Sequence, residues 1–236
     1  MAKGENQNTR RQFVNFAFYK VDLAWRRLPE AERAAAKHEF YQVVESYKDG
    51  MIILSYATIG VRGDCDFMLW RISYELESFQ QMTAKLLATG LGRYLATPYS
   101  YLSMTRQSIY TREHIHPGQQ DTRGQIVPGE HKYLFIYPFV KTREWYRLTL
   151  SARQGIMNEH IAIGHKYPSV KLNTTYSFGL DDQEFVLAFE ADSPSDFLDL
   201  VMELRESESS RYTQRDTPIF TCIKRSIDET LNLLGG

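Results

Sequence analysis

Asp64-Cys-Asp-Phe67-Met-Leu69-Trp-Arg-Ile72 is followed 118 residues later by a similar stretch, Asp182-Gln-Glu-Phe185-Val-Leu187-Ala-Phe-Glu190. The agreement continues beyond both stretches at the same offset. Because matches in one register indicate an internal duplication, we expect two copies of one structural unit. The matched pairs are Asp64 with Asp182, Phe67 with Phe185, Leu69 with Leu187, Phe79 with Phe197, Met82 with Leu200, and Leu86 with Leu204.

Each copy lies within a β-α-β-β-α-β series of hydrophobic patterns. The first half predicts strands over 12–20, 50–58, 64–72 and 99–106 and helices over 28–46 and 75–89. The second half predicts strands over 132–140, 169–178, 184–191 and 218–224 and helices over 144–160 and 194–206. We therefore predict an α+β fold of two ferredoxin-like repeats that bury their open sheet faces against one another, a dimeric α/β-barrel-type fold with room for a ligand cavity inside one half.

A long polar segment, 110–131, connects the two halves. It contains Pro117, Gly118, Gly124, Pro128 and Gly129, which is typical of a loop. Connections longer than about 15 residues are either disordered or functional, and the two histidines in this one favour a lid. We divide the chain into an N-terminal ferredoxin-like half, 1–109, for packing and subunit contacts, this loop, and a C-terminal ferredoxin-like half, 132–236.

Composition excludes several classes of partner. The 236-residue chain has a net charge of −1, and its 28 basic and 29 acidic residues form no long block of one sign, so we expect no nucleic-acid or anionic-membrane surface. Cys65 and Cys222 lie far apart, which indicates neither a zinc site nor a disulfide framework. The polar start lacks a signal-peptide core, and no segment approaches the roughly 18 apolar residues that span a bilayer, so we expect a soluble, cytoplasmic protein.

His160 is the first candidate for chemistry. Helical spacing places Ala152, Ile156 and Met157 near its face, so the imidazole would project into an apolar layer. A neutral ring can bind iron there without a buried charge. A hydrogen-bonded core histidine is the other interpretation, and His165, just after the predicted helix, is the rival ligand.

Tyr137 is the second candidate. It shares one face of its predicted strand with Tyr133, Phe135, Phe139 and Lys141. If that face lines a cavity, a phenol and an ammonium whose Cα atoms are about 13 Å apart could serve different edges of one porphyrin-sized substrate. The alternative is an aromatic core strand with an interfacial lysine.

Three segments, 106–116, 132–160 and 204–222, resemble the chlorite dismutase-like family, and most closely its coproheme decarboxylase branch. The second includes Arg153-x-x-x-Met157-x-x-His160, which is similar to the family's axial-histidine segment. The resemblance implies a haem-type iron site in the C-terminal half and an enzyme that makes haem b from iron-coproporphyrin III (coproheme). It also implies hydrogen peroxide as the second substrate and a homopentameric assembly.

The resemblance implies roles for three residues in one reaction. His160 would be the axial iron ligand, Tyr137 the redox-active residue, and Lys141 a propionate contact. Peroxide oxidises the histidine-ligated iron, which takes an electron from Tyr137, and the tyrosyl radical removes a hydrogen from a propionate β-carbon. Loss of carbon dioxide leaves a vinyl group. Two rounds give haem b through a three-propionate intermediate, so iron-coproporphyrin is both substrate and redox centre.

Four further residues receive roles from the same resemblance. His114, or alternatively His116, would be the distal base that deprotonates peroxide. Arg123 would contact a propionate, since a guanidinium suits a carboxylate. Ser209 would stand where chlorite-degrading members carry an acidic partner of the axial histidine, as a weaker partner or as a propionate contact.

Departures from the pattern bear on the activity. Chlorite-degrading relatives use a distal arginine, but the corresponding position here is Leu172 or, with a one-residue shift, Asn173. Those relatives also lack a tyrosine at the place of Tyr137, and the glutamine of the other decarboxylase branch is absent. Two alternatives remain: a chlorite dismutase or haem peroxidase on the same fold, and a non-enzymatic haem-binding protein that needs His160 but not Tyr137 or Lys141.

Overall fold

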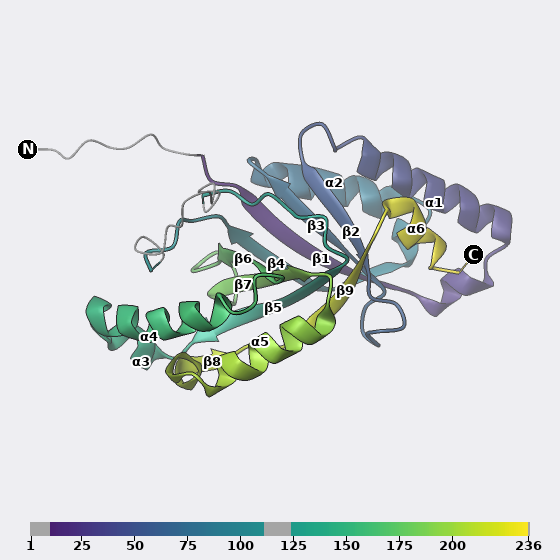
Figure 1. The fold of residues 1–236 in the computed structure, drawn as a ribbon. Coiled ribbons are helices and arrows are strands. Elements are labelled where there is room, and N and C mark those ends of the chain that lie inside the picture. Colours follow the sequence, from purple (N-terminus) through teal and green to yellow (C-terminus); the bar gives the residue numbers. More distant parts are fainter. Residues whose placement is uncertain (1–9, 111–123, 236) are drawn as a thin grey trace, which may run out of the picture.

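The duplicated order of elements is present in the three-dimensional structure. A computed structural model describes residues 10–110 and 124–235 (Figure 1). The first half runs β1 (Phe13–Val21), the 3-10 helix η1 (Leu23–Arg27), α1 (Glu30–Glu45), β2 (Ile52–Ala57), β3 (Phe67–Ser73), α2 (Leu76–Ala88), η2 (Gly92–Tyr94) and β4 (Leu95–Met104). The second runs β5 (Tyr133–Lys141), α3 (Arg143–Arg147), α4 (Leu150–Gly164), β6 (Lys171–Tyr176), β7 (Phe185–Ala191), α5 (Pro194–Glu206), η3 (Glu208–Tyr212), β8 (Thr213–Arg215), β9 (Phe220–Arg225) and α6 (Ile227–Asn232). The predicted α+β fold of two ferredoxin-like repeats is confirmed.

The strands of both halves close into one antiparallel barrel. Their order in the described chain is β7-β6-β4-β1-β3-β2-β9-β5, and β5 pairs back onto β7. The seams between the halves are narrow: β4 meets β6 at the pair Met104–Tyr176, and β2 meets β9 through Ser55–Ala57. Inward-facing side chains fill the interior with a mixed aromatic and aliphatic core that includes Phe16, Phe18, Trp70, Leu134, Ile136, Val186, Phe220 and both cysteines.

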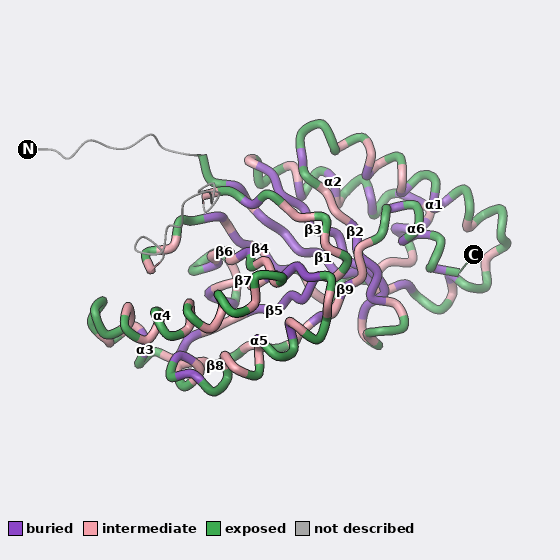
Figure 2. Tube along the Cα trace, in the orientation of Figure 1, coloured by how far each residue is buried: buried purple, intermediate pink, exposed green. Residues whose placement is uncertain are grey.

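Helices cover the outside of the barrel, and they pack unequally. α1, α2 and α6 lie over the N-terminal half, and α4 and α5 over the C-terminal half (Figure 1). α1 buries Ala36, Lys37, Phe40 and Val44, whereas no residue of α4 is buried (Figure 2). α4 therefore packs less closely on its sheet than α1 does. None of the helices in the described ranges is long and apolar enough to cross a bilayer.

The predicted single helix over 144–160 is wrong. The chain forms α3, turns extended at Leu148, and begins α4 at Leu150 with Thr149 as its N-cap. The Thr149 hydroxyl accepts a hydrogen bond from the Ala152 amide, which satisfies one of the free N–H groups of the new first turn. α4 then continues past His160 to Gly164, so that histidine lies within the helix and not at its end.

Candidate functional site

The outer face of the C-terminal sheet, here called the aromatic face, carries Tyr137. Tyr137 lies opposite Leu187, and Leu187 opposite Thr174. Tyr137 is 8% exposed and its ring stacks on Phe189 at 5.9 Å. Burial raises the pKa of Tyr137, so its phenol stays protonated at neutral pH. The aromatic face comprises Tyr133, Phe135, Tyr137 and Phe139 of β5, Phe185, Leu187 and Phe189 of β7, and Leu172, Thr174 and Tyr176 of β6.

His160 lies on α4, above this face. Its Nδ1 is 3.0 Å from the Ser209 Oγ. Burial, with a contribution from the charge of Lys141, lowers the pKa of His160 to about 4, so the imidazole is neutral at pH 7. Within the described part of the chain, no hydrogen-bonding group is paired with its Nε2. The ring thus has one nitrogen held by the protein and one available.

Lys141 lies beside the same serine. Its Nζ donates to the Ser209 carbonyl at 2.9 Å and sits 4.7 Å from the centre of the Trp145 ring. Lys141 is 8% exposed, and burial lowers its pKa to about 8, against the opposing effect of the Glu184 carboxylate. Lys141 and His160 therefore meet at Ser209, and Tyr137 lies four residues before Lys141 on the same strand.

Aromatic residues close one end of this layer. Trp145 on α3 packs against Tyr212 at 5.5 Å and against Tyr110 at 6.2 Å. Gln154 on α4 donates to the Tyr110 carbonyl at 3.1 Å. Burial raises the pKa of the Tyr110 phenol, and the charge of Arg153 opposes this effect. The Arg153 Nε is buried without a partner among the described residues. The chain leaving β4 therefore crosses to α4 at the point where the described part ends.

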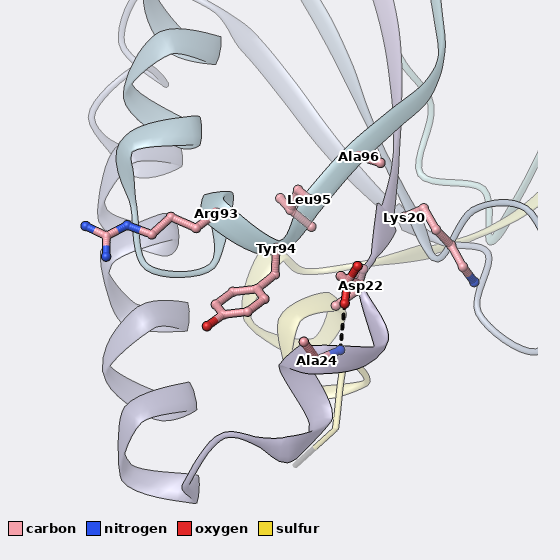
Figure 3. A pocket seen from close by; sticks show the side chains of 8 residues that line it. Lys20, Asp22, Ala24, Arg93, Tyr94, Leu95 and Ala96 are labelled. Carbon is pink, nitrogen blue, oxygen red and sulfur yellow. Dashed lines mark hydrogen bonds between the residues drawn. The ribbon is translucent and has the colours of Figure 1, made fainter.

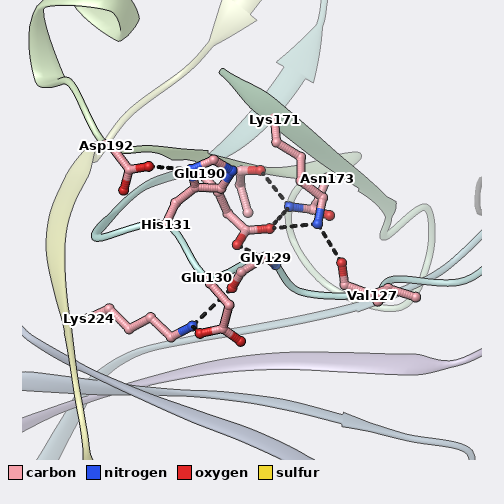
Figure 4. Close-up of polar contacts among 10 residues, drawn as sticks. Val127, Gly129, Glu130, His131, Lys171, Asn173, Glu190, Asp192 and Lys224 are labelled. Atoms are coloured by element: carbon pink, nitrogen blue, oxygen red, sulfur yellow. Dashed lines mark hydrogen bonds and ion pairs between the residues drawn. The ribbon is translucent and has the colours of Figure 1, made fainter. Parts of the chain in front are cut away.

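Three of the candidates from sequence lie outside the described residues. These are His114, His116 and Arg123, within 111–123. The structure does describe the far end of the linker, which returns to the sheet through a buried carboxylate (Figure 4). Glu190 is 1% exposed and accepts from the Gly129 amide at 2.7 Å and from the Asn173 side chain at 2.8 Å, with Lys171 at 3.3 Å.

Strand β6 settles which of two neighbouring residues belongs to the aromatic face. Leu172 pairs with Phe189 on that face and is 47% exposed. Asn173 points to the other side, where it bonds Glu190. Successive residues of a strand alternate between its two faces, so Leu172, and not Asn173, belongs to the aromatic face. β6 contains no arginine on that face.

A cleft lies on the N-terminal half, away from these residues. It measures about 510 Å³ and is lined by Lys20, Asp22, Arg93 and Tyr94, among others (Figure 3). Asp22 accepts from the Ala24 amide at 2.7 Å, and Lys20 pairs with Asp66 at 2.9 Å. Lys20 and Arg93 extend to opposite sides in Figure 3, so no charged groups converge in this cleft.

The N-terminal half provides an internal comparison for the site. Adding 120 to the bounds of β1, 13–21, gives those of β5, 133–141, and the same shift relates η1 to α3 and the start of α1 to that of α4. The positions of Tyr137, Lys141 and His160 are then occupied by Ala17, Val21 and Phe40, all buried in one apolar core. Trp25 matches Trp145. Sequence reasoning missed this tryptophan, although its recurrence at the same shift was a visible signal.

The residues present fit an iron porphyrin better than an isolated metal ion. Among the described residues no three His, Cys, Asp or Glu side chains are grouped as a metal site. A porphyrin supplies four nitrogen ligands itself and needs one axial group from the protein, which a neutral histidine with a free nitrogen provides. An aromatic sheet face beneath a helix without buried residues suits a flat macrocycle.

Comparisons with known proteins agree with this chemistry. The family model described as chlorite dismutase matches residues 33–225. The chain is 31% identical over 179 residues to the coproheme decarboxylase of Mycolicibacterium smegmatis, covering 75% of this chain and 74% of that protein. It is 27% identical over 206 residues to the chlorite dismutase of Ideonella dechloratans, covering 86% and 72%.

A solved structure is similar over nearly the whole chain. The chlorite dismutase from Candidatus Nitrospira defluvii in complex with imidazole gives a TM-score of 0.84 at 26% identity, and the match covers 94% of both chains. The barrel and its outer helices are therefore shared with that protein.

Proposed function

Because this chain belongs to the chlorite dismutase family, we propose that it is an enzyme that decarboxylates two propionates of iron-coproporphyrin III with hydrogen peroxide. The product is haem b, reached through a three-propionate intermediate. The observation that carries the proposal is that Lys141 and His160 meet at Ser209 and that Tyr137 lies on the same strand as Lys141, whereas the N-terminal half has buried apolar residues at all three positions. A haem carrier has use for the histidine but not for a buried tyrosine and lysine beside it.

The substrate supplies the redox chemistry, and the protein supplies binding and positioning. His160 would hold the iron through Nε2, since its Nδ1 is engaged by Ser209. The aromatic face would contact the bound substrate. Lys141 is mainly protonated at pH 7, because its pKa is about 8, and offers donors to a propionate carboxylate.

Tyr137 carries the hydrogen transfer. Its phenol is kept protonated by burial, so it gives up an electron and the Oη proton together and leaves a neutral radical. That radical takes a hydrogen atom from the propionate β-carbon, and loss of carbon dioxide releases the second electron, so that each round passes two electrons to one hydrogen peroxide. In each round one propionate, one hydrogen peroxide and one proton give one vinyl group, one carbon dioxide and two waters. His114 is proposed as the base for peroxide, with His116 as the alternative, and Arg123 as a further propionate contact.

Chlorite conversion is disfavoured by a specific residue. At the position that corresponds to the distal arginine of chlorite-degrading relatives, β6 presents Leu172 on the aromatic face, and this side chain can neither stabilise an oxyanion nor donate a hydrogen bond.

The test follows the mass of the porphyrin. Ligand-free protein is loaded with iron-coproporphyrin III and titrated with hydrogen peroxide, and products are analysed by mass spectrometry for wild type and Tyr137→Phe. We expect stepwise loss of two units, each carbon dioxide plus two hydrogens, in wild type and none in the variant. Bleaching without mass loss in both proteins would reject the decarboxylase in favour of a peroxidase or a haem-binding protein.

A further inference from the structure

Two serines after α5 form a chain of hydrogen bonds that begins at His160. The His160 Nδ1 is 3.0 Å from the Ser209 Oγ, and the Ser209 Oγ is 2.9 Å from the Ser207 Oγ. The Ser207 Oγ donates at 2.7 Å to the Leu204 carbonyl, in the last turn of α5. Both serines are buried, Ser207 at 5% and Ser209 at 3% exposure. Both side chains are thus shielded from water, and protein groups alone decide which atom donates in each of these hydrogen bonds.

Counting protons gives this chain one direction. The Leu204 carbonyl can only accept, so the single hydroxyl proton of Ser207 is used there. Ser207 must then accept from Ser209, which uses the single proton of Ser209. The contact between Ser209 and His160 is left with one possible proton, the one on Nδ1.

We propose that Ser207, through Ser209, is a positioning residue that fixes the proton of His160 on Nδ1 and leaves the Nε2 lone pair free to bind iron. The role in iron binding rests on the proposed function, whereas the position of the proton is a property of the ligand-free protein. The reverse direction would place the proton on Nε2, where it blocks coordination.

Comparison with the N-terminal half supports a specific role for the two serines at His160. In the N-terminal half, where Phe40 occupies the position of His160, the segment after α2 begins with Thr89, whose hydroxyl donates to the Leu86 carbonyl at 2.7 Å. This is the counterpart of the bond from Ser207 to Leu204, since both residue pairs differ by 118. The Thr89 hydroxyl then accepts from the Gly92 amide at 3.0 Å, where Ser207 has the hydroxyl of Ser209. Both halves therefore have the hydrogen bond from this hydroxyl to the last turn of the preceding helix. Only the half that has His160 continues it through a second hydroxyl to α4.

The experiment locates the proton directly. Ligand-free protein labelled with ¹⁵N in histidine is examined by NMR near pH 7, and the His160 signals are identified by their loss in His160→Phe. We expect the hydrogen-bearing nitrogen to be Nδ1. In Ser207→Ala, Ser209 is free to turn its proton toward His160, so the ratio of the Nδ1-H to the Nε2-H form should fall by about fivefold, as expected for loss of one neutral hydrogen bond.

Two variants serve as controls. Ser207→Thr keeps the hydroxyl and should restore the wild-type ratio. Ser210→Ala removes a hydroxyl from the same turn that donates to the Arg205 carbonyl and takes no part in the chain, so it should leave the ratio unchanged. Circular dichroism verifies that each variant is folded.

The outcomes separate this inference from the proposed function. A wild-type His160 with its proton on Nε2, or a ratio that is the same in Ser207→Ala, overturns the inference, whatever the porphyrin does. A proton on Nδ1 with no histidine–iron stretching band after loading with iron-coproporphyrin leaves the inference standing and contradicts the proposed function. With both intact, Ser207→Ala should weaken iron-coproporphyrin binding by less than fivefold, in proportion to the fall in the fraction of His160 that carries its proton on Nδ1.

Discussion

His160 is held as a neutral base in a partly buried position, and this has a cost at low pH. The folded protein binds the proton only near pH 4, whereas an unfolded histidine binds it near pH 6.5. The unfolded state therefore gains the proton first as the pH falls, and stability is lost from about pH 6.5 down to about pH 4.

His160→Phe should remove this pH dependence, because it installs the residue that the N-terminal half has at the same place. We expect the ligand-free wild type to lose about 2 kcal/mol of unfolding free energy between pH 7 and pH 5 from this group, and the variant to lose that much less. Urea unfolding at the two pH values measures both. An equal loss in the two proteins would mean that other groups dominate.

Lys141 should make the affinity for iron-coproporphyrin depend on pH in the alkaline range. Its charge is lost as the pH rises through about 8, so a contact with a propionate weakens there. At pH 7, Lys141→Met should bind iron-coproporphyrin about tenfold more weakly than wild type, in line with loss of a charge-assisted hydrogen bond. At pH 9.5 the difference should largely disappear. Lys224→Met, whose amine holds the Gly129 carbonyl, is the matched control. Its affinity should follow wild type at both pH values.

Among the elements, strand β7 has different tasks on its two sides. Phe189 lies on the aromatic face, while the next residue, Glu190, turns inward and ties down the returning linker. The Glu190 carboxylate is almost fully enclosed and faces the charged Lys171. Such a carboxylate is costly to neutralise because its donors are left without an equivalent acceptor.

Glu190→Gln should therefore lower the unfolding free energy by about 2 kcal/mol, a value reduced because Lys171 is partly exposed. Asp192→Asn is the control: this carboxylate also holds the end of the linker, at His131, and the adjoining Lys132 amide, but it is 70% exposed and its loss should cost well under 1 kcal/mol. Urea unfolding compares the two. Equal small effects would show that the buried carboxylate does not fasten the linker.

The sequence predicted the elements better than the contacts between them. The repeat and the alternation of apolar residues were sufficient for the strands and for most helices, because those signals are local. The break between α3 and α4 was missed, since Thr149 can cap a helix or continue one, and packing decides. Ser207 could not be found, because its role depends on where the end of α5 meets α4. The choice between Leu172 and Asn173 needed the register of β6.

For the whole molecule, the main feature is the inequality of two similar halves. One is filled by its own side chains and the other has a helix that buries none. In the ligand-free protein we expect α1 amides to exchange slowly with solvent deuterium and α4 amides quickly. Binding of iron-coproporphyrin should slow exchange in α4 and leave α1 unchanged. Equal protection of both helices without ligand would contradict the looser packing of α4.

The closed barrel also separates two kinds of chemistry. Cys65 and Cys222 lie in its interior with no exposed surface, and burial raises the pKa of both thiols. Peroxide attacks the thiolate and not the thiol, so these side chains are slow to oxidise. Under the proposed function, hydrogen peroxide reacts on the outer face of the sheet, whereas the thiols of Cys65 and Cys222 lie on its inner side. The closed barrel that the two halves form together therefore protects the protein's cysteines from the hydrogen peroxide that it uses.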